Sequence, residues 1–482
     1  MTTDRVIVVG GGITGLAAAR RLALAGIPVT LVEAGERLGG RIATRRADGF
    51  TLEDGPDSFL TTRPAALDLV RELGLGDRLV APLEPRRVFI RHRGRLLPVP
   101  DGVGLGIPSR LTPMARTRLF SPAEKLRMAA DLVSPRVLEA DDAAVGSFLR
   151  ARLGSALVDR LAGPLLGGVY GTPIDELSLD AVMPQLRRAE RDHRSLLLAG
   201  LADRRAAAAA PRTGTPGTTP FVALREGMGT IVDALEEALV AAGVDIVRGR
   251  PLAGLARAGG GVRARFADGD RWTVAGAVLT VPGPAAARLL GDELPVAARA
   301  LAAIPHGAST LVTLAYPRSA VRGPLAGHGY LVPAAERSPV SACTWVSEKW
   351  PGRAPADAVL FRLSVRSAGH GFDPATAPDG EVVVAARGDV ERTLGISGRP
   401  LVSHVTRWPD AMARYTVGHL QRLEAVEAAL ADWPAVVLAG ASYRGMGLPD
   451  CVAQGTDAAH RLVERLGSGP AAGETRPLAA TA

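Results

Sequence analysis

The chain opens with an apolar run that predicts a buried parallel strand. Residues 5–9 read RVIVV, a β-branched stretch that ends abruptly at three glycines. Apolar residues then recur at helical spacing until Gly26, which is placed to end a helix. A second apolar run, residues 29–32, ends at Glu33. This order of strand, glycine turn, helix and strand predicts a βαβ unit of Rossmann type.

The middle of the chain has a different pattern. Residues 106–190 hold short amphipathic stretches broken by prolines and lack the alternation of a sheet, so we expect a helical insertion there. Residues 203–220 (DRRAAAAAPRTGTPGTTP) are low in complexity and predict a mobile surface loop. Residues 466–482 predict a disordered tail for the same reason.

The last part of the chain returns to mixed helices and strands. A glycine-punctuated helix is expected at 226–243. Short strands are expected at 244–248, 262–266, 271–274 and 277–281, and the last of these reads like a central parallel strand. Residues 300–400 alternate like an antiparallel sheet, and 435–465 predict a strand, a glycine loop and a final helix.

The charge of the chain does not indicate a polyanionic partner. Lysine and arginine number 57 against 49 acidic residues, which gives a net charge of +8. Only Lys125 and Lys349 are lysines, and the arginines are scattered rather than gathered into basic runs. We therefore expect solvated surface charge and no nucleic-acid partner.

Cysteine usage and hydropathy favour a reducing, aqueous compartment. Cys343 and Cys451 have neither disulfide nor zinc-ligand spacing, so no metal site is expected. No apolar stretch approaches about twenty residues, and the N-terminus lacks a signal-peptide pattern. We expect a cytoplasmic protein with at most peripheral membrane contact.

The glycines after the first strand carry the first candidate chemistry. Gly10-x-Gly12-x-x-Gly15 lies between a strand and a helix, where glycines allow a tight turn and close approach of a pyrophosphate to helix N–H groups. Glu33, at the end of the second strand, can accept hydrogen bonds from ribose hydroxyls. Together they predict a dinucleotide cofactor.

Two further glycine segments favour FAD over a nicotinamide. Residues 34–41 (AGERLGGR) follow the ribose carboxylate, and their Gly-Gly pair lets backbone approach a diphosphate whose charge Arg41 can offset. Residues 438–455 (LAGASYRGMGLPDCVAQG) predict a second glycine loop before a helix whose N–H groups could face the flavin. Two such loops far apart in the chain suggest one extended ligand held at both ends.

Several more segments resemble one family. They are EDGPDSFL (53–60), LREGMGT (224–230), SACTWVSEKWP (341–351), RWPDAMARYTVGH (407–419) and the 445–451 loop. With the glycine motifs they resemble the flavin-dependent protoporphyrinogen and coproporphyrinogen III oxidases of haem synthesis, within the flavin monoamine oxidase superfamily. The likeness is strongest to the soluble bacterial, coproporphyrin-forming branch, and it covers nearly the whole chain.

The resemblance implies a set of FAD contacts. The glycine turn and the ribose carboxylate would make the first contacts with FAD, and the GPDS segment would form a loop beside the flavin ring. One apolar residue would contact the adenine side, and the C-terminal part of the chain would make the remaining flavin contacts. The residues are Gly10, Gly11, Gly12, Ile13, Thr14, Gly15, Glu33, Ala34, Gly39, Gly40, Arg41, Gly55, Pro56, Asp57, Ser58, Leu252, Trp408, Met446, Gly447 and Leu448.

The implied substrate is a macrocycle with carboxylate arms, which needs apolar walls and cations at the rim. Arg63 matches a position thought to pair with a propionate, and Lys349 and Arg362 are further candidates. Coproporphyrinogen, with four propionates, should need more cations than protoporphyrinogen, with two. Trp345 and Trp350 are candidates for pocket walls or for sheet core.

The implied reaction is oxidation of coproporphyrinogen III to coproporphyrin III. A hydride passes from a methylene bridge to the flavin and a pyrrole N–H proton is lost, repeated three times, with dioxygen as acceptor and hydrogen peroxide as by-product. We assign no protein general base. We expect His193, His306, His328 and His419 to be structural. A ferrochelatase is a candidate partner for product hand-off.

Other functions remain open on the sequence alone. Protoporphyrinogen IX is the alternative substrate of the same family. A flavin amine or carotenoid oxidoreductase would keep the FAD motifs but would need neither the cations nor the SACTW…KWP segment. A non-enzymatic flavoprotein or membrane-associated chaperone would use the helical region, residues 106–190, as its working surface.

The expected fold class is α/β, with a Rossmann-type FAD-binding domain assembled from separated segments, a substrate domain built on an antiparallel sheet, and a helical insertion. The FAD domain comprises residues 1–90, 221–290 and 402–465. The substrate domain comprises residues 91–105, 191–202 and 291–401, and the insertion comprises 106–190.

Overall fold

The first βαβ unit lies at the centre of a parallel sheet. The computed structural model describes residues 4–104, 106–139, 141–209, 219–367 and 371–467. Within these ranges a five-stranded sheet has the order β12-β2-β1-β16-β22. Its strands are β1 (Val6–Val9), β2 (Val29–Val32), β12 (Asp245–Val247), β16 (Gly276–Leu279) and β22 (Val436–Leu438). All pairs are parallel, so three separated segments build one Rossmann-type sheet, as expected.

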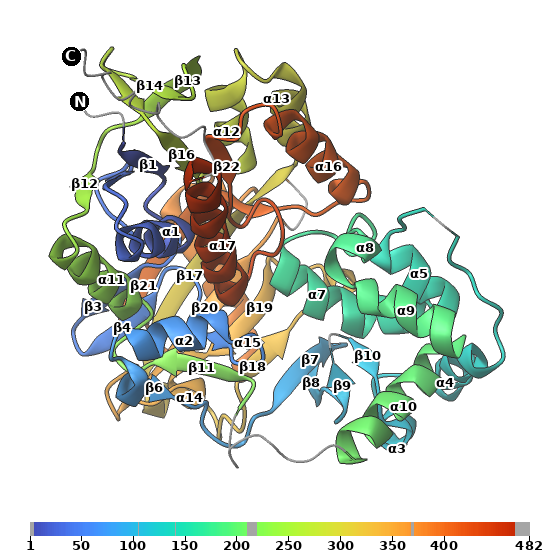
Figure 1. Ribbon diagram of the computed structural model, residues 1–482. Coiled ribbons are helices and arrows are strands. Elements are labelled where there is room, and N and C mark those ends of the chain that lie inside the picture. The colour runs from blue at the N-terminus through green and yellow to red at the C-terminus, as the bar shows by residue number, and fades with distance from the viewer. Residues whose placement is uncertain (1–3, 105, 140, 210–218, 368–370, 468–482) are drawn as a thin grey trace, which may run out of the picture.

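Helices cover one face of this sheet. Figure 1 shows α17 (Leu448–Gly467) lying against α1 (Ile13–Leu24), with α11 (Gly229–Ala241) and α2 (Ala65–Glu72) nearby. A Cβ on Gly455 would lie 2.2 Å from the carbonyl oxygen of Thr14, so only glycine lets α17 approach α1 this closely. The first and last helices of the fold therefore meet at the start of α1.

The other face is covered by a second hydrophobic core. A three-stranded antiparallel sheet packs there with three helices, and its first strand was not expected from the sequence. The elements are β13 (Leu252–Ala258), β14 (Gly261–Phe266), β15 (Arg271–Val274), α12 (Gly283–Leu290), α13 (Pro295–Ala302) and α16 (His419–Leu430).

A larger sheet forms the substrate side. In the described part of the chain it has seven strands, antiparallel except for the β18–β7 pair, in the order β21-β17-β20-β19-β18-β7-β8. The strands are β21 (Val402–Ala413), β17 (His306–Pro317), β20 (Ala358–Val365), β19 (Val340–Trp345), β18 (Gly329–Leu331), β7 (Val88–His92) and β8 (Arg95–Pro98).

Three expectations about this sheet need correction. Residues 402–413, expected in the FAD domain, form β21 and pair with β17, and β7 crosses the expected boundary at residue 90. Within 300–400 the chain also contains α15 (Asp379–Leu394), which packs on the sheet. Its acidic first turn and the left-handed Gly395 at its end are ordinary helix signals within a region that otherwise alternates.

The helical insertion is present and extends further than expected. Leu196 and Leu197 of α10 (Leu196–Ala209) lie in the insertion's own core, so residues 196–209 belong to neither the substrate sheet nor a loop. Residues 210–218 of the expected loop and residues 468–482 of the expected tail lie outside the described residues. The other helices are α3 (Leu111–Arg116), α4 (Pro122–Ala129), α5 (Val145–Leu153), α6 (Ser155–Leu157), α7 (Gly163–Tyr170), α8 (Leu179–Val182) and α9 (Pro184–His193).

Short elements connect these layers. They are β3 (Thr44–Ala47), β4 (Phe50–Glu53), β5 (Phe59–Leu60), β6 (Leu79–Val80), β9 (Val103–Gly104), β10 (Ile107–Pro108), β11 (Phe221–Leu224) and α14 (Val346–Lys349). Among the described residues no helix combines the length and apolarity needed to cross a bilayer, and no three His, Cys, Asp or Glu side chains gather as a metal site would require.

Candidate active site

Gly10, Gly12 and Gly15 form the turn between β1 and α1. Gly10 has a φ of +106°, which favours glycine, and its carbonyl oxygen accepts a hydrogen bond of 2.9 Å from the Thr280 hydroxyl. A Cβ on Gly15 would lie 1.9 Å from that same oxygen. By contrast, a Cβ on Gly12 would meet nothing within 4 Å, and no side chain caps α1 there. The open N–H groups at the start of α1 can therefore bind a phosphate.

Glu33 is held at the end of β2 by backbone amides. Its Oε2 accepts a hydrogen bond of 2.6 Å from the N–H of Gly11, and its Oε1 accepts one of 2.8 Å from Gly35. The N–H of Gly39 donates to the Gly11 carbonyl at 2.8 Å, so the Gly-Gly-Arg run lies against the same turn. The carboxylate and both glycine turns thus occupy one edge of the sheet, as a dinucleotide site requires.

Arg41 joins this edge to more distant segments. Its Nη2 donates a hydrogen bond of 2.7 Å to the carbonyl oxygen of Asp410 in β21. Burial lowers the pKa of the Arg41 guanidinium, and Cys451 and Asp410 oppose that shift. A Cβ on Gly55 would lie 1.8 Å from the Arg41 carbonyl oxygen, so the GPDS loop passes directly over it. Arg41 therefore lies where the Gly-Gly-Arg run, the GPDS loop and β21 meet.

Asp57 is the charged centre of the GPDS loop. Its Oδ2 accepts hydrogen bonds from Lys349 Nζ at 2.9 Å and from Trp350 Nε1 at 3.0 Å, and Arg362 Nη2 lies 3.8 Å from Oδ1. Burial alone would raise the pKa of the Asp57 carboxyl. Lys349, Arg362 and the hydrogen bonds outweigh burial and hold that pKa well below its usual range, so the carboxylate stays charged.

Lys349 and Arg362 are therefore already paired. Their side chains are only 20% and 18% exposed, and Arg362 also donates a hydrogen bond of 2.6 Å to the Gly55 carbonyl. Both expected substrate cations thus stabilise the GPDS loop. A substrate carboxylate would have to displace Asp57 to reach either of them.

The loop between β22 and α17 is fixed by side chains from two directions. Gln454 of α17 donates to the Gly445 carbonyl at 2.9 Å and accepts from the Gly440 N–H at 3.2 Å. The Tyr415 hydroxyl accepts a hydrogen bond of 2.9 Å from the Gly445 N–H. Cys451, buried at the start of α17, has its pKa raised to about 11 by burial, so it is not a reactive thiolate.

Arg63 lies just before α2 and forms an ion pair with Asp450, in the first turn of α17. The Arg63 side chain is 60% exposed, far more than Lys349 or Arg362. Burial raises the pKa of Tyr170, at the end of α7, and the nearby charges of Arg63 and Asp450 act on that pKa in opposite directions. An accessible cation therefore stands where the helical insertion meets the cofactor-type loop.

Comparison with known protein families identifies the family that has these motifs. The family model described as "Flavin containing amine oxidoreductase" matches residues 13–463, nearly the whole chain. The chain belongs to this flavin-containing amine oxidoreductase family. FAD is its cofactor, as the glycine motifs predict, and the protein is an enzyme.

Full-length relatives narrow the comparison. A coproporphyrinogen III oxidase of Propionibacterium freudenreichii is 43% identical over 95% of this chain and 90% of its own length. The coproporphyrinogen III oxidase of Bacillus subtilis is 35% identical over 93% of this chain and 96% of its own length. A crystal structure from Exiguobacterium sp. 255-15, assigned provisionally as a protoporphyrinogen oxidase, has a TM-score of 0.82 and 34% identity over 96% of this chain and 100% of that one.

His306 and His328 of this flavin-containing oxidoreductase each contact a backbone carbonyl. His306 Nδ1 donates to the Ile304 carbonyl at 3.0 Å, and its Nε2 lies 3.0 Å from the Ser442 hydroxyl. His328 lies 2.7 Å from the Leu83 carbonyl. Burial lowers the pKa of both rings, which favours the neutral form. His193 is exposed at the end of α9. We find no carboxylate hydrogen-bonded to these three rings among the described contacts.

The remaining expected contacts lie in different surroundings. Trp408 donates its Nε1–H to the Asp54 carbonyl at 2.6 Å, which brings β21 to the GPDS loop. Leu252 is half-buried in β13 opposite Phe266. Trp350 is fully buried and Trp345 is in the core of the large sheet, so both contribute to packing.

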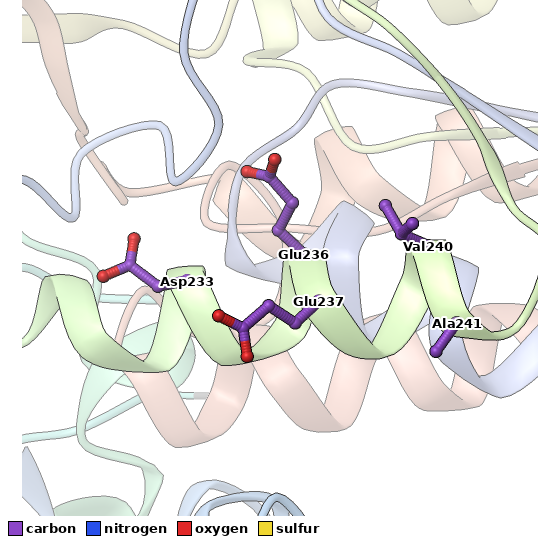
Figure 2. A pocket seen from close by; sticks show the side chains of 5 residues that line it. All are labelled: Asp233, Glu236, Glu237, Val240 and Ala241. Carbon is purple, nitrogen blue, oxygen red and sulfur yellow. The ribbon is translucent and has the colours of Figure 1, made fainter.

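Two hollows lie beside the start of the cofactor edge. One of about 380 Å³ is bordered by Arg37, Leu38 and Val232, next to the Gly-Gly-Arg run. The other, of about 480 Å³, lies over α11, and Figure 2 shows Glu236 and Glu237 among its side chains. None of the expected cofactor contacts borders either hollow, so neither hollow defines the reaction site.

Sequence reasoning missed three residues that shape the site. Thr280 holds the glycine turn, Gln454 holds the C-terminal loop, and Asp450 pairs with Arg63. Gln454 and Asp450 stand inside the segment singled out as a glycine loop, and Thr280 inside a strand read only as apolar. Each of the three is a polar residue within a segment that was interpreted only for its glycines or its apolar residues, and this polarity could have marked them as candidates for hydrogen bonds at the site.

Proposed function

We propose that the protein oxidises coproporphyrinogen III to coproporphyrin III, with dioxygen as acceptor and hydrogen peroxide as by-product. The observation that carries the proposal is full-length similarity to several enzymes named coproporphyrinogen III oxidase, at up to 43% identity. The site is consistent with this activity because it combines an FAD edge with an accessible cation at its rim. The resulting role is a step in haem biosynthesis in the cytoplasm, with product hand-off to a ferrochelatase as a further prediction.

We place FAD along the edge formed by the two N-terminal glycine turns, the GPDS loop and the start of α17. The open start of α1 supports a pyrophosphate there, and Glu33 supports the ribose. The proposed contacts are Gly10 to Gly15, Glu33, Ala34, Gly39 to Arg41, Gly55 to Ser58, Leu252, Trp408 and Met446 to Leu448.

When bound, FAD supplies the hydride acceptor for this chemistry. The chain itself binds and orients. Asp57 cannot serve as a general base, because its pKa lies far below neutrality and its oxygens are already hydrogen-bonded. We therefore assign catalysis to positioning of the methylene bridge against the cofactor, name no side chain as general base, and expect the pyrrole proton to pass to solvent.

Arg63 is the residue we assign to a substrate propionate. It is the most accessible of the three expected cations, and because its side chain is 60% exposed, a substrate propionate can reach it and compete with Asp450. Lys349 and Arg362 are poorer candidates because Asp57 balances them in a buried setting.

Parallel initial rates with coproporphyrinogen III and protoporphyrinogen IX test the substrate. We expect a higher kcat/KM for coproporphyrinogen III, and Arg63→Ala should raise its KM about fivefold or more. Arg71→Ala, which removes an exposed cation from α2, is the matched control and should change neither constant. Equal or greater kcat/KM with protoporphyrinogen IX would identify that compound as the substrate instead.

Protoporphyrinogen IX is the second candidate because two relatives point to it. A chloroplast protoporphyrinogen oxidase of Arabidopsis thaliana is 29% identical over 94% of this chain, and the Exiguobacterium structure carries the same provisional assignment. An amine substrate is less favoured, because the putrescine oxidase and cyclohexylamine oxidase structures are 17% and 20% identical and share only the fold.

A further inference from the structure

The segment from Tyr415 to Gly418 joins the helical insertion to the rest of the molecule. The Ser178 N–H donates to the Tyr415 carbonyl at 2.7 Å, and the Val417 N–H donates to the Glu176 carbonyl at 3.1 Å. The Gly418 N–H donates to an Asp142 carboxylate oxygen at 3.1 Å. The insertion is therefore attached through backbone and side-chain contacts to the segment that follows β21.

The side chains of the same segment contact the C-terminal loop. The Tyr415 hydroxyl donates a hydrogen bond of 2.9 Å to the Ala441 carbonyl and accepts one of 2.9 Å from the Gly445 N–H. His419 Nε2 donates to the Tyr443 carbonyl at 2.8 Å. Two side chains thus hold three backbone groups of residues 441–445, directly before Met446.

Tyr415 and His419 also fix each other. Their rings stack with centroids 4.1 Å apart and an interplanar angle of 14°, and they are 2% and 0% exposed. Burial raises the pKa of the Tyr415 hydroxyl above its usual range and lowers that of His419 to about 4. Both side chains are therefore uncharged at neutral pH, and the donors and acceptors of their hydrogen bonds to the loop do not change there.

We propose that Tyr415 and His419 are positioning residues that set the flavin-side loop, residues 441–447, relative to the helical insertion. The inference rests on the proposed contact between FAD and Met446 to Leu448. Neither residue touches the reacting atoms, and both act through the loop. Tyr415 links the two parts directly. Its backbone carbonyl accepts a hydrogen bond from the insertion, and its side-chain hydroxyl is hydrogen-bonded to the loop.

The loop has a second support that keeps the proposal testable. Gln454 of α17 binds the Gly445 carbonyl and the Gly440 N–H. Loss of the Tyr415 hydroxyl should therefore displace the loop without unfolding it. The ring, its stacking on His419 and the Ser178 contact all survive in Tyr415→Phe.

The experiment compares Tyr415→Phe with Tyr316→Phe in the full-length holoenzyme, without any porphyrinogen. Tyr316 is a matched control, because it is fully buried and its hydroxyl donates a 2.9 Å hydrogen bond to Glu391 of α15, far from the C-terminal loop in sequence. We expect Tyr415→Phe to raise the Kd for FAD about tenfold and to shift the flavin absorption spectrum and midpoint potential. Tyr316→Phe should leave all three at their wild-type values, even if it lowers the Tm as much.

An unchanged FAD Kd, spectrum and potential in Tyr415→Phe would overturn the proposal, as would equal changes in Tyr316→Phe. If Tyr415→Phe fails to fold, His419→Phe serves instead, because it keeps a stacked ring and loses only the bond to the Tyr443 carbonyl. The same shifts are expected there, and their absence contradicts the proposal. Wild-type protein that binds FAD but oxidises no porphyrinogen would refute the proposed substrate and leave this inference standing.

Discussion

The ammonium of Lys349 lies 2.9 Å from a carboxylate oxygen of Asp57, across nearly three hundred residues of sequence. The same oxygen accepts the indole N–H of Trp350 at 3.0 Å, and Arg362 lies nearby. The SACTW…KWP segment and the GPDS loop, two separate parts of the family likeness, are therefore one structural unit. Its role is to hold the loop that we place beside the flavin.

Asp57→Asn should destabilise the protein because it leaves Lys349 and Arg362 without their buried counter-charge. Breaking such a pair costs about 3–5 kcal/mol, so chemical unfolding at pH 7 should show a loss of that order. The folded-state pKa of Asp57 is depressed, so its contribution is present above the unfolded pKa and lost as the pH falls. The deficit should shrink below about pH 4.

Asp68→Asn is the control for that substitution. Asp68 is an exposed carboxylate on α2, 3.8 Å from Arg71, and its loss should change stability by less than about 0.5 kcal/mol. Equal effects of the two substitutions would show that Asp57 does not hold a buried charge centre.

Gly12→Ala and Gly15→Ala should separate cofactor binding from folding. A Cβ at Gly12 meets open space, so the apoprotein should fold while the new methyl group blocks the pyrophosphate and abolishes FAD binding. A Cβ at Gly15 would lie 1.9 Å from a backbone oxygen, so that variant should be destabilised as well. Circular dichroism melts and flavin content of the purified proteins measure the two effects. Gly260→Ala, in another open position, should change neither.

Asp450→Asn should lower the KM for the porphyrinogen. Asp450 forms an ion pair with Arg63, so its carboxylate should compete with a substrate propionate for that cation. Because the Arg63 side chain is largely exposed, we take the pair to contribute about 1 kcal/mol, which corresponds to a decrease of about fivefold. Steady-state kinetics of the holoenzyme measure it. A rise in KM, or a decrease that persists in the Arg63→Ala background, would show that the two residues do not compete.

Stability should fall between pH 7 and pH 5 because His419 is buried and neutral. Its folded-state pKa is about 4, against 6.5 when unfolded, so the unfolded chain binds the proton first as the pH falls. Its contribution is complete above about pH 6.5 and is lost toward pH 4. Between pH 7 and pH 5 the wild-type protein should lose about 2 kcal/mol of unfolding free energy through His419, as measured by urea unfolding. This loss should be absent in His419→Phe. It should persist in the control variant His460→Phe, because His460 is exposed. A wild-type slope in His419→Phe would contradict this assignment.

Local signals explain what the sequence could predict. The Rossmann start was predictable because β-branched runs, positive-φ glycines and a terminal carboxylate each specify their own local geometry. The late strands near residues 245, 277 and 436 were predictable for the same reason. The segment 203–209 was misread, because its alanines, taken for low complexity, are strong helix formers and extend α10 to Ala209.

Long-range pairing explains what the sequence could not predict. The alternation of residues 402–413 indicates a strand but not its partner, and β21 pairs with β17 in the large sheet. The charges of Lys349 and Arg362 suggested substrate contacts, yet only the fold brings Asp57 between them. The glycine motifs of the candidate site were visible one by one, whereas the hydrogen bond from the Gly445 N–H to the Tyr415 hydroxyl depends on packing between separate segments.

The most direct test of the proposed function is anaerobic titration of the FAD-loaded enzyme with coproporphyrinogen III. We expect the yellow flavin absorption to bleach and coproporphyrin III to appear, with three flavins reduced for each porphyrin formed, because the conversion removes three hydrides and three protons. Flavin that stays oxidised with coproporphyrinogen III, but bleaches with an amine, would contradict the proposed function.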